Sequence, residues 1–285
     1  MRNVRGFTLI ELVVVIVLSS IVVSFMAMFI AGPVRSYTDQ VRRAELVDIA
    51  ESSIRRMARD VRRALPNSIR VTTSGPIVAL EMINTVDGVR YRGQPPPDDA
   101  SKRLEFTAAD AAFNSVGTFT GISKPFSSTS HYLSVYNVGV PGASAYELAN
   151  VITPPGTQID IVTDTVAGED NVTLSPAFRF AYGSPAQRIF LLDGPLSYLC
   201  DLGTGTLTRY SGYNITMSHS DRDSAAELIA AGAADTLIAD QISACSIAYA
   251  PGTSQRAGLV TLQLTVADTG ESISLLHQVH VSNAP

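Results

Sequence analysis

A stretch of twenty uncharged residues near the N-terminus, residues 12–31, is the feature that most restricts the fold of this chain. Three serines interrupt its aliphatic and aromatic side chains: Ser19, Ser20 and Ser24. At about 1.5 Å per residue, a helix of this length extends about 30 Å, the thickness of the hydrocarbon core of a membrane. Arg2 and Arg5 precede the stretch, and the first charge after it is Arg35. The sequence therefore predicts a single-pass membrane helix with a cytoplasmic N-terminus.

A secretory signal peptide is the alternative interpretation of this segment, because it also has a basic start and an apolar body. The apolar region of a signal peptide is usually about 7 to 15 residues long and ends at a small-residue cleavage site. Here the stretch is longer, begins beside Glu11 and closes with Gly32-Pro33. The membrane helix is the favoured interpretation.

The start of this helix carries a motif, Gly6-Phe7-Thr8-Leu9-Ile10-Glu11-Leu12-Val13. The motif resembles the leader of the type IV prepilins and pseudopilins. In that family a membrane peptidase cuts after the glycine and methylates the new amine. The resemblance therefore implies cleavage between Gly6 and Phe7, N-methylation of Phe7, and an α+β, type IV pilin-like fold.

Glu11 needs a partner, because an acidic residue costs about 2.5 to 3.5 kcal/mol at the centre of a membrane helix and less near its ends. Cleavage after Gly6 would create one, since the amine of Phe7 lies four residues before Glu11 on the same helix face. In a filament, Glu11 could instead accept the amine of a neighbouring subunit, and we predict that it is an assembly contact. The alternative is an ordinary carboxylate in the lipid headgroup layer.

The charge of the chain is unevenly distributed along the sequence. Residues 1–65 hold ten arginines and six acids, a balance of +4, whereas residues 66–285 hold eleven Lys/Arg and twenty Asp/Glu, a balance of −9. The larger part of the chain therefore lacks the basic footprint of a nucleic-acid-binding protein, and we expect no nucleic acid as a partner.

A second, amphipathic helical segment follows Gly32-Pro33, which predicts a break or kink before the helix resumes. Apolar residues recur at three- and four-residue spacing up to Pro66: Val47, Ala50, Ile54, Met57, Val61 and Leu65. The opposite face is charged and includes Glu51, Arg55, Arg56, Arg59, Asp60, Arg62 and Arg63. This face is either solvated or contacts acidic faces of adjacent subunits.

Beyond Pro66 the sequence predicts mostly β structure, with strands in residues 68–80 and loops at 94–99 and 140–156. Residues 198–213 contain glycines but no following helix, which favours a hairpin over a phosphate-binding loop. An antiparallel hairpin is predicted from alternating residues around Asp268-Thr269-Gly270, namely Val260, Leu262, Leu264, Val266, Ile273, Leu275, His277, Val279 and Val281. A capping box of Ser224 and Glu227 predicts a short helix within 223–232, which Gly232 can close.

The only cysteines, Cys200 and Cys245, both fall on the predicted outer side of the membrane. An oxidising compartment favours a disulfide between them, and closing a loop of this length is worth about 4 kcal/mol in the chain-entropy model. Two buried free thiols are the alternative.

No residue pattern in this sequence matches a catalytic motif well. We therefore predict that the chain is not an enzyme and has no catalytic residue, no cofactor and no metal. The four histidines are His131, His219, His277 and His280, and the last two lie three apart on a predicted strand, which points them to opposite faces. Four acids of one outer loop could hold calcium but lack the ordered spacing of a known calcium loop: Asp160, Asp164, Glu169 and Asp170. A solvated acidic loop is favoured there.

We expect four regions: a leader (1–6), a membrane and filament-core helix (7–32), an amphipathic second half of the helix (33–65) and a β-rich globular domain (66–285). The segment 198–213 is also similar to one in minor pilins of the mannose-sensitive haemagglutinin (MSHA) pilus. The resemblance implies a minor pilin stored in the bacterial inner membrane with its domain in the periplasm, then carried on the pilus at the cell surface. Its partners would be other pilins and the prepilin peptidase. A type II secretion pseudopilin, or a membrane-anchored adhesin or enzyme, are the alternatives.

Overall fold

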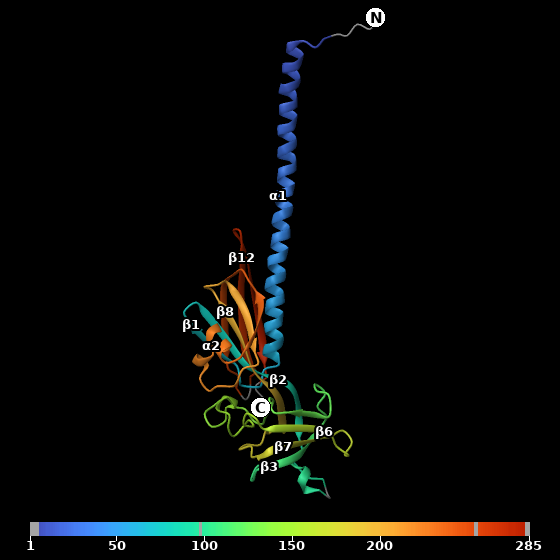
Figure 1. Ribbon diagram of the computed structural model, residues 1–285, viewed down its shortest axis with the longest axis vertical. Coiled ribbons are helices and arrows are strands. Elements are labelled where there is room, and N and C mark those ends of the chain that lie inside the picture. Colours follow the sequence, from blue (N-terminus) through green and yellow to red (C-terminus); the bar gives the residue numbers. More distant parts are fainter. Residues whose placement is uncertain (1–5, 97–98, 254–255, 283–285) are drawn as a thin grey trace. The chain divides into compact units, whose positions relative to one another are not determined.

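The computed structural model describes residues 6–96, 99–253 and 256–282, so the predicted leader lies outside the described residues except for Gly6. The chain divides into two compact units, Met1–Asp48 and Ile49–Pro285, and each is described by itself. A long N-terminal helix is followed by a β-rich domain, so the predicted α+β fold class is confirmed (Figure 1).

The N-terminal helix α1 extends without a break from Leu9 to Arg62. Pro33 lies inside it, so of the predicted break or kink at Gly32-Pro33 the break is wrong. A proline removes one intrahelical hydrogen bond and leaves the bonds of the turns on either side, which suffice here to continue the helix. Its most apolar 18-residue window has a mean hydropathy of 2.8 and is long enough to cross a membrane.

The C-terminal end of α1 falls three residues earlier than the predicted end at Leu65. The N–H of Leu65 donates to the carbonyl oxygen of Ile83 at 2.8 Å, and the N–H of Thr85 donates to the carbonyl oxygen of Arg63 at 3.0 Å. These bonds to an adjacent strand replace the last helical turn. The prediction missed them because they join residues far apart in the sequence.

The predicted apolar stripe of the helix is buried over most of its length. Ala50, Ile54, Met57 and Val61 are at most 4% exposed. Val47 is 37% exposed, so its place in the stripe was predicted wrongly. Leu46, four residues before Ala50, is 1% exposed, so the buried stripe passes through residue 46 in this turn.

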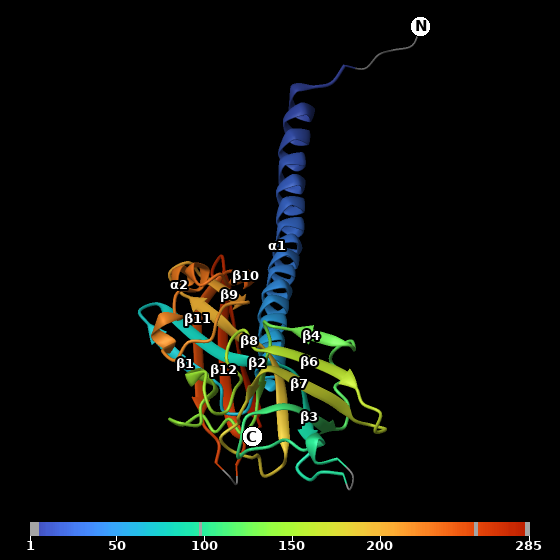
Figure 2. The same ribbon diagram turned by 60° about the horizontal axis from the view of Figure 1, so that its bottom comes forward.

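A ten-stranded antiparallel sheet forms the larger part of the domain. The path through it is β10-β9-β8-β2-β3-β7-β6-β4, with β1 on β2 and β5 on β8. Its strands are β1 (Arg70–Ser74), β2 (Ile77–Tyr91), β3 (Asp110–Val116), β4 (Phe126–Ser128), β5 (Tyr132–Ser134), β6 (Gln158–Thr163), β7 (Asp170–Phe178), β8 (Arg188–Asp201), β9 (Thr206–Ser211) and β10 (Ala234–Ala239). The long strands β2 and β8 connect the group β3, β6 and β7 with the end that carries β1 and α2 (Figure 1 and Figure 2).

A separate three-stranded sheet contains β11 (Ile242–Ala250), β12 (Gly258–Asp268) and β13 (Glu271–Val281). Strands β12 and β13 pair antiparallel from Asp268↔Glu271 onward, which confirms the predicted C-terminal hairpin. Thr269 and Gly270 both have positive φ, 45° and 88°, the combination that a tight hairpin turn of type I′ requires. The β8–β9 pairing confirms the second predicted hairpin as well.

Short helices complete the domain: η1 (Ala100–Lys102), η2 (Ala145–Glu147), η3 (His219–Asp221) and α2 (Ala225–Ala230). The predicted capping box is present, since the side chain of Ser224 accepts from the N–H of Glu227 while Glu227 accepts from the N–H of Ser224. Leu228 of α2 packs with Ala79, Leu199 and Tyr210, which attaches this helix to the sheet.

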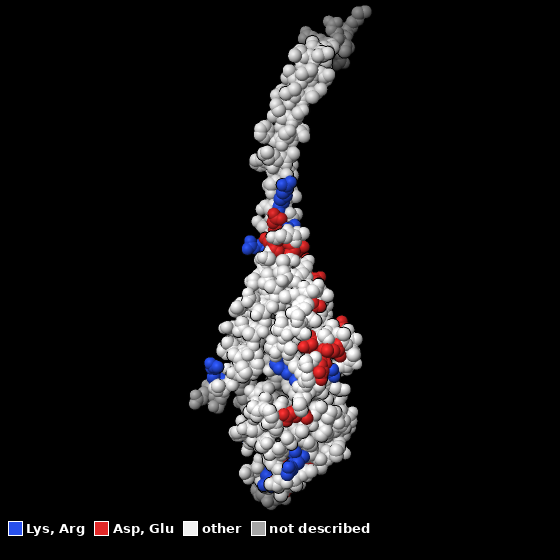
Figure 3. All heavy atoms as spheres, turned by 90° about the vertical axis from the view of Figure 1, so that its left-hand side faces the viewer, with Lys and Arg blue, Asp and Glu red and all other residues white. Residues whose placement is uncertain are grey.

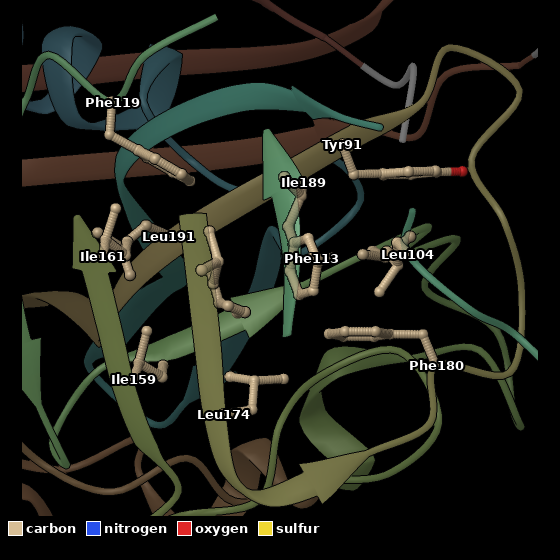
Figure 4. Close-up of a cluster of buried hydrophobic side chains, with 13 residues drawn as sticks. Tyr91, Leu104, Phe113, Phe119, Ile159, Ile161, Leu174, Phe180, Ile189 and Leu191 are labelled. Carbon is tan, nitrogen blue, oxygen red and sulfur yellow. The ribbon is translucent and has the colours of Figure 1, made fainter. Parts of the chain in front are cut away.

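An apolar core lies where β2, β3, β6, β7 and β8 meet (Figure 4). Alternate residues of the strands point into it, as Ile159 and Ile161 of β6 do. The ring centroids of Phe178 and Phe180 lie 4.9 Å apart in an edge-to-face contact. Such pairs contribute about 0.5 to 1.5 kcal/mol beyond the burial of their surface.

Asp60 was predicted to lie on the charged outer face of the helix. In the structure it instead connects the end of α1 to the sheet. The hydroxyl of Tyr198 donates to Asp60 Oδ2 at 2.7 Å, and Arg209 Nε donates to the same oxygen at 3.0 Å. Burial and the hydrogen bond to Asp60 raise the pKa of Tyr198. An acidic residue one position from the apolar stripe can thus point toward the sheet when strand residues donate hydrogen bonds to its carboxylate.

We expect Asp60→Ala to destabilise the domain by about 2 to 3 kcal/mol, because it leaves a phenol and a guanidinium without their acceptor. For a domain of this size, the thermal midpoint should fall by about 5 to 10 °C in circular dichroism of the detergent-solubilised full chain. Glu51→Ala is the matched control, since the Glu51–Arg55 pair is exposed and should be worth less than about 1 kcal/mol. Equal effects of the two variants would contradict this role of Asp60.

Candidate functional site

The residues before α1 leave the predicted cleavage point accessible. Gly6, Phe7 and Thr8 precede the first helical residue, Leu9. The side chain of Phe7 is 84% exposed, and no atom lies within 4 Å of the place where a Cβ on Gly6 would stand. A peptidase needs an uncovered peptide bond outside regular structure, and the Gly6–Phe7 bond is both exposed and outside the helix.

Glu11 lies in the first turn of the helix and is bonded to Thr8. The N–H and the hydroxyl of Thr8 both donate to Glu11 Oε2 at 3.2 Å, and the N–H of Glu11 donates to Thr8 Oγ1 at 3.3 Å. This reciprocal arrangement is a capping box. Its sequence signature, a threonine followed three residues later by a glutamate, was present in the motif and was missed by the sequence analysis.

The capping box decides where the carboxylate of Glu11 points. It turns back toward the N-terminus of the helix, where the helix dipole favours a negative charge. Phe7, the residue next to Thr8, is the one whose nitrogen becomes an amine after cleavage. The geometry therefore places an anion beside the future cation, and the pairing of Glu11 with Phe7 stays a prediction because that nitrogen is still an amide here.

Cys200 and Cys245 come from different sheets and lie next to each other. Cys200 is on β8 and buried, and Cys245 is on β11 and half-buried; both are free thiols in the structure. Their hydrogen-bond contact, together with burial, raises the pKa of the Cys200 thiol. The fold therefore brings the two predicted partners together without a bond between them, and the disulfide remains a prediction.

The four acids considered for calcium already have protein partners. Asp164 accepts from Lys102 Nζ at 2.6 Å, and this bond lowers the pKa of Asp164 to about 2. The other three bond to Gln158, Arg92 and Lys124, in the pairs Asp160–Gln158, Glu169–Arg92 and Asp170–Lys124. Within residues 6–96, 99–253 and 256–282, no group of three His, Cys, Asp or Glu side chains comes together as a metal site.

A buried ionic cluster around Glu81 was not found from the sequence. The Glu81 side chain on β2 is fully buried; it accepts from Arg70 Nε at 2.5 Å and from the hydroxyl of Tyr213 at 2.9 Å. Burial raises the pKa of Glu81, and Arg70 opposes that shift. The guanidinium of Arg70 also stacks on the ring of Tyr146, 3.6 Å from its centroid. A single glutamate in a strand pattern gave no signal of this cluster.

His219 joins the cluster from η3. Its Nδ1 lies 2.5 Å from Thr72 Oγ1, and its Nε2 lies 3.8 Å from Glu81 Oε2. Burial, and the charge of Arg70 to a lesser extent, lower the pKa of His219 to about 4. His219 is therefore neutral at pH 7, and its Nε2 has no hydrogen-bond partner among the described residues.

Residues 1–27 match the family described as the prokaryotic N-terminal methylation motif. No curated protein and no solved structure matches the chain. The motif match supports a type IV prepilin or pseudopilin, and the long apolar helix followed by a β-rich domain fits a type IV pilin-like fold. The single apolar helix near the N-terminus fits the single-pass membrane anchor of such proteins. The motif implies processing by the prepilin peptidase.

Stability should fall on acidification between pH 6.5 and pH 4 because of His219. The unfolded chain binds a proton near pH 6.5, whereas the folded chain resists it down to about pH 4, so acid favours unfolding. The loss should reach up to about 3 kcal/mol. Urea unfolding at pH 7, 5.5 and 4 should show a smaller acid loss for His219→Gln, which cannot titrate. A variant with an unchanged pH dependence would contradict the assignment.

Protein recovered from an oxidising compartment should contain the Cys200–Cys245 disulfide. Thiol titration of unfolded, unreduced protein should find no free thiol, and reduction should cost about 4 kcal/mol of stability. Cys245→Ser is the control, since it should expose one free thiol and lose the effect of reduction. Two free thiols in the wild-type protein would contradict the disulfide.

Proposed function

We propose that this chain is a minor pilin, a structural and assembly subunit that enters a type IV filament through its N-terminal helix and is not an enzyme. The observation that carries the proposal is the methylation motif over residues 1–27, with an accessible Gly6–Phe7 bond followed by Glu11 in the first helical turn. The proposal places the protein in the bacterial inner membrane with its domain in the periplasm, and later on the pilus.

Cleavage supplies the partner of Glu11. Cutting after Gly6 exposes the amine of Phe7, which is then N-methylated and stays cationic beside the capping-box carboxylate. On incorporation, Glu11 exchanges this contact for the amine of a neighbouring subunit. A bare carboxylate at membrane depth is costly, so the exchange favours a subunit that is paired with a neighbour over one that is not.

The filament is proposed to be an MSHA-like pilus. Support comes from the similarity of the hairpin 198–213 to a segment of the MSHA minor pilin MshO. A type II secretion pseudopilin is the nearest alternative, because it would share the motif and the helix.

An adhesin or enzyme that uses α1 only as an anchor is the alternative from another class. Such a protein would keep its leader, so N-terminal sequencing separates the two classes. A mature chain that begins at Phe7 supports the pilin.

Glu11→Ala should leave cleavage after Gly6 intact and reduce recovery in sheared filaments at least tenfold, because the variant cannot pair with a neighbouring amine. Immunoblots of membrane and filament fractions measure both effects, and mass spectrometry reports cleavage and methylation. Glu51→Ala, which removes an exposed acid further along the same helix, is the matched control and should assemble normally. Normal incorporation of processed Glu11→Ala protein would refute the pairing.

A further inference from the structure

Two adjoining hollows on the domain are lined by arginines. One, of about 420 Å³, includes Arg90 and Arg188, and the other, of about 250 Å³, includes Arg62, Arg63 and Arg188. Arg188 and Phe190 line both. We call the two hollows together the basic groove.

The four arginines of the basic groove have no acidic partner among the residues that the structure describes. All four are exposed, and none forms an ion pair with a carboxylate in the part of the chain that the structure describes. Arg63 donates to the carbonyl oxygen of Thr85 and Arg90 to the side-chain oxygen of Gln187, both neutral acceptors. Four unneutralised cations therefore gather in a chain with a net charge of −5.

The strand register makes this gathering costly. Arg90 of β2 and Arg188 of β8 are direct cross-strand partners. Like charges at opposed positions destabilise a sheet, and an anion between them removes that cost. Thr85 adds a buried hydroxyl, which has no hydrogen-bond partner among the described residues. The groove thus combines several guanidinium groups with the unpaired hydroxyl of Thr85. Guanidinium groups form paired hydrogen bonds with carboxylates, and the hydroxyl can donate another.

Nearby acids do not neutralise the groove. Asp87 Oδ2 accepts the N–H groups of Thr120 and Gly121 at 2.6 and 2.7 Å. Asp193 bonds to the side-chain amide of Asn84. Each of these carboxylates is held by neutral donors of its own.

A complementary acidic patch lies elsewhere on the same domain, over η3 and α2. Asp221, Asp223 and Glu227 are close enough that the other two contribute, after burial, to the raised pKa of Asp223. Arg222 lies between two of them but is half-buried, and its charge acts on the buried Glu81. Acidic side chains gather on this face of the domain in Figure 3. Because α2 packs on Leu199, the patch lies about 35 Å along β8 from Arg188 at 3.3 Å per residue.

We propose that the basic groove receives the acidic η3–α2 patch of a second copy of this chain. Two complementary surfaces at different places on one body form a head-to-tail contact, and such contacts produce an open helical assembly where the rotation between copies does not close a ring. The proposal rests on the proposed function, because a filament subunit is expected to meet its neighbours head to tail.

Photo-crosslinking of the full, uncut chain in membranes tests the contact. Benzoylphenylalanine at Val116, which lines the groove and is 43% exposed, should give a crosslinked dimer that maps to residues 221–227 of the second copy. Arg90→Glu with Arg188→Glu should reduce the yield at least fivefold. Asp221→Arg with Asp223→Arg in a differently tagged second copy should restore at least half of it.

Two controls keep the result specific. Arg179→Glu reverses an exposed charge outside the groove and should leave the yield within twofold. Raising the ionic strength from 10 mM to 1 M shortens the screening length from about 30 to about 3 Å and should reduce the wild-type yield at least fivefold. Circular dichroism verifies that the reversed variants are folded, and Arg90→Ala with Arg188→Ala should give an intermediate yield.

The contact is refuted if no dimer forms, if the crosslink leads to lipid or to another protein, or if charge reversal has no effect. Failure of charge-swap rescue also overturns it. These outcomes are separate from the proposed function, because cleavage after Gly6 and incorporation through Glu11 do not need the groove. Normal processing and incorporation together with an absent dimer would reject the contact alone.

Discussion

The cost of a carboxylate at the start of a membrane helix is the constraint on which this molecule depends. Glu11 precedes twenty uncharged residues, and lipid offers it no water. The capping box with Thr8 gives this carboxylate a local partner before any cleavage and turns it toward the N-terminus. The same contact satisfies the first turn of the helix and turns the acid toward the end of the chain where the proposed amine would form.

The β-rich domain is organised by the pairing of β2 with β8. Arg188 pairs with Arg90 at one end of these strands and Asp201 pairs with Ile77 at the other, so one strand pair connects the core around Phe113 with the end that carries α2. Asp60 attaches the end of α1 to β8 and β9. A strand pair of this length holds Arg188 and the α2 end of the domain far apart.

Apart from the Thr8–Glu11 capping box, which was missed, sequence reasoning worked where the signal was local. Alternating residues around Thr269-Gly270 predicted the C-terminal hairpin, and Ser224 with Glu227 predicted the α2 cap, because turns and caps depend on a few adjacent residues. It failed at Pro33 and Val47, where the geometry of the whole helix decides the outcome. It also missed Glu81 and its partners, because nothing in the strand pattern shows that Tyr213 and His219, far along the chain, pack against this residue.

The sequence by itself determined the membrane helix, the motif at Gly6 and Glu11 and the β-rich character of the domain, because hydrophobic length, spacing and turn residues act over short ranges. Only the tertiary structure decided that Cys200 meets Cys245 between two sheets, that Asp60 faces inward, and that Arg90 and Arg188 lie opposite each other. Strand order and register set those contacts. They depend on which surfaces are buried together, and a linear pattern of residues does not contain that information.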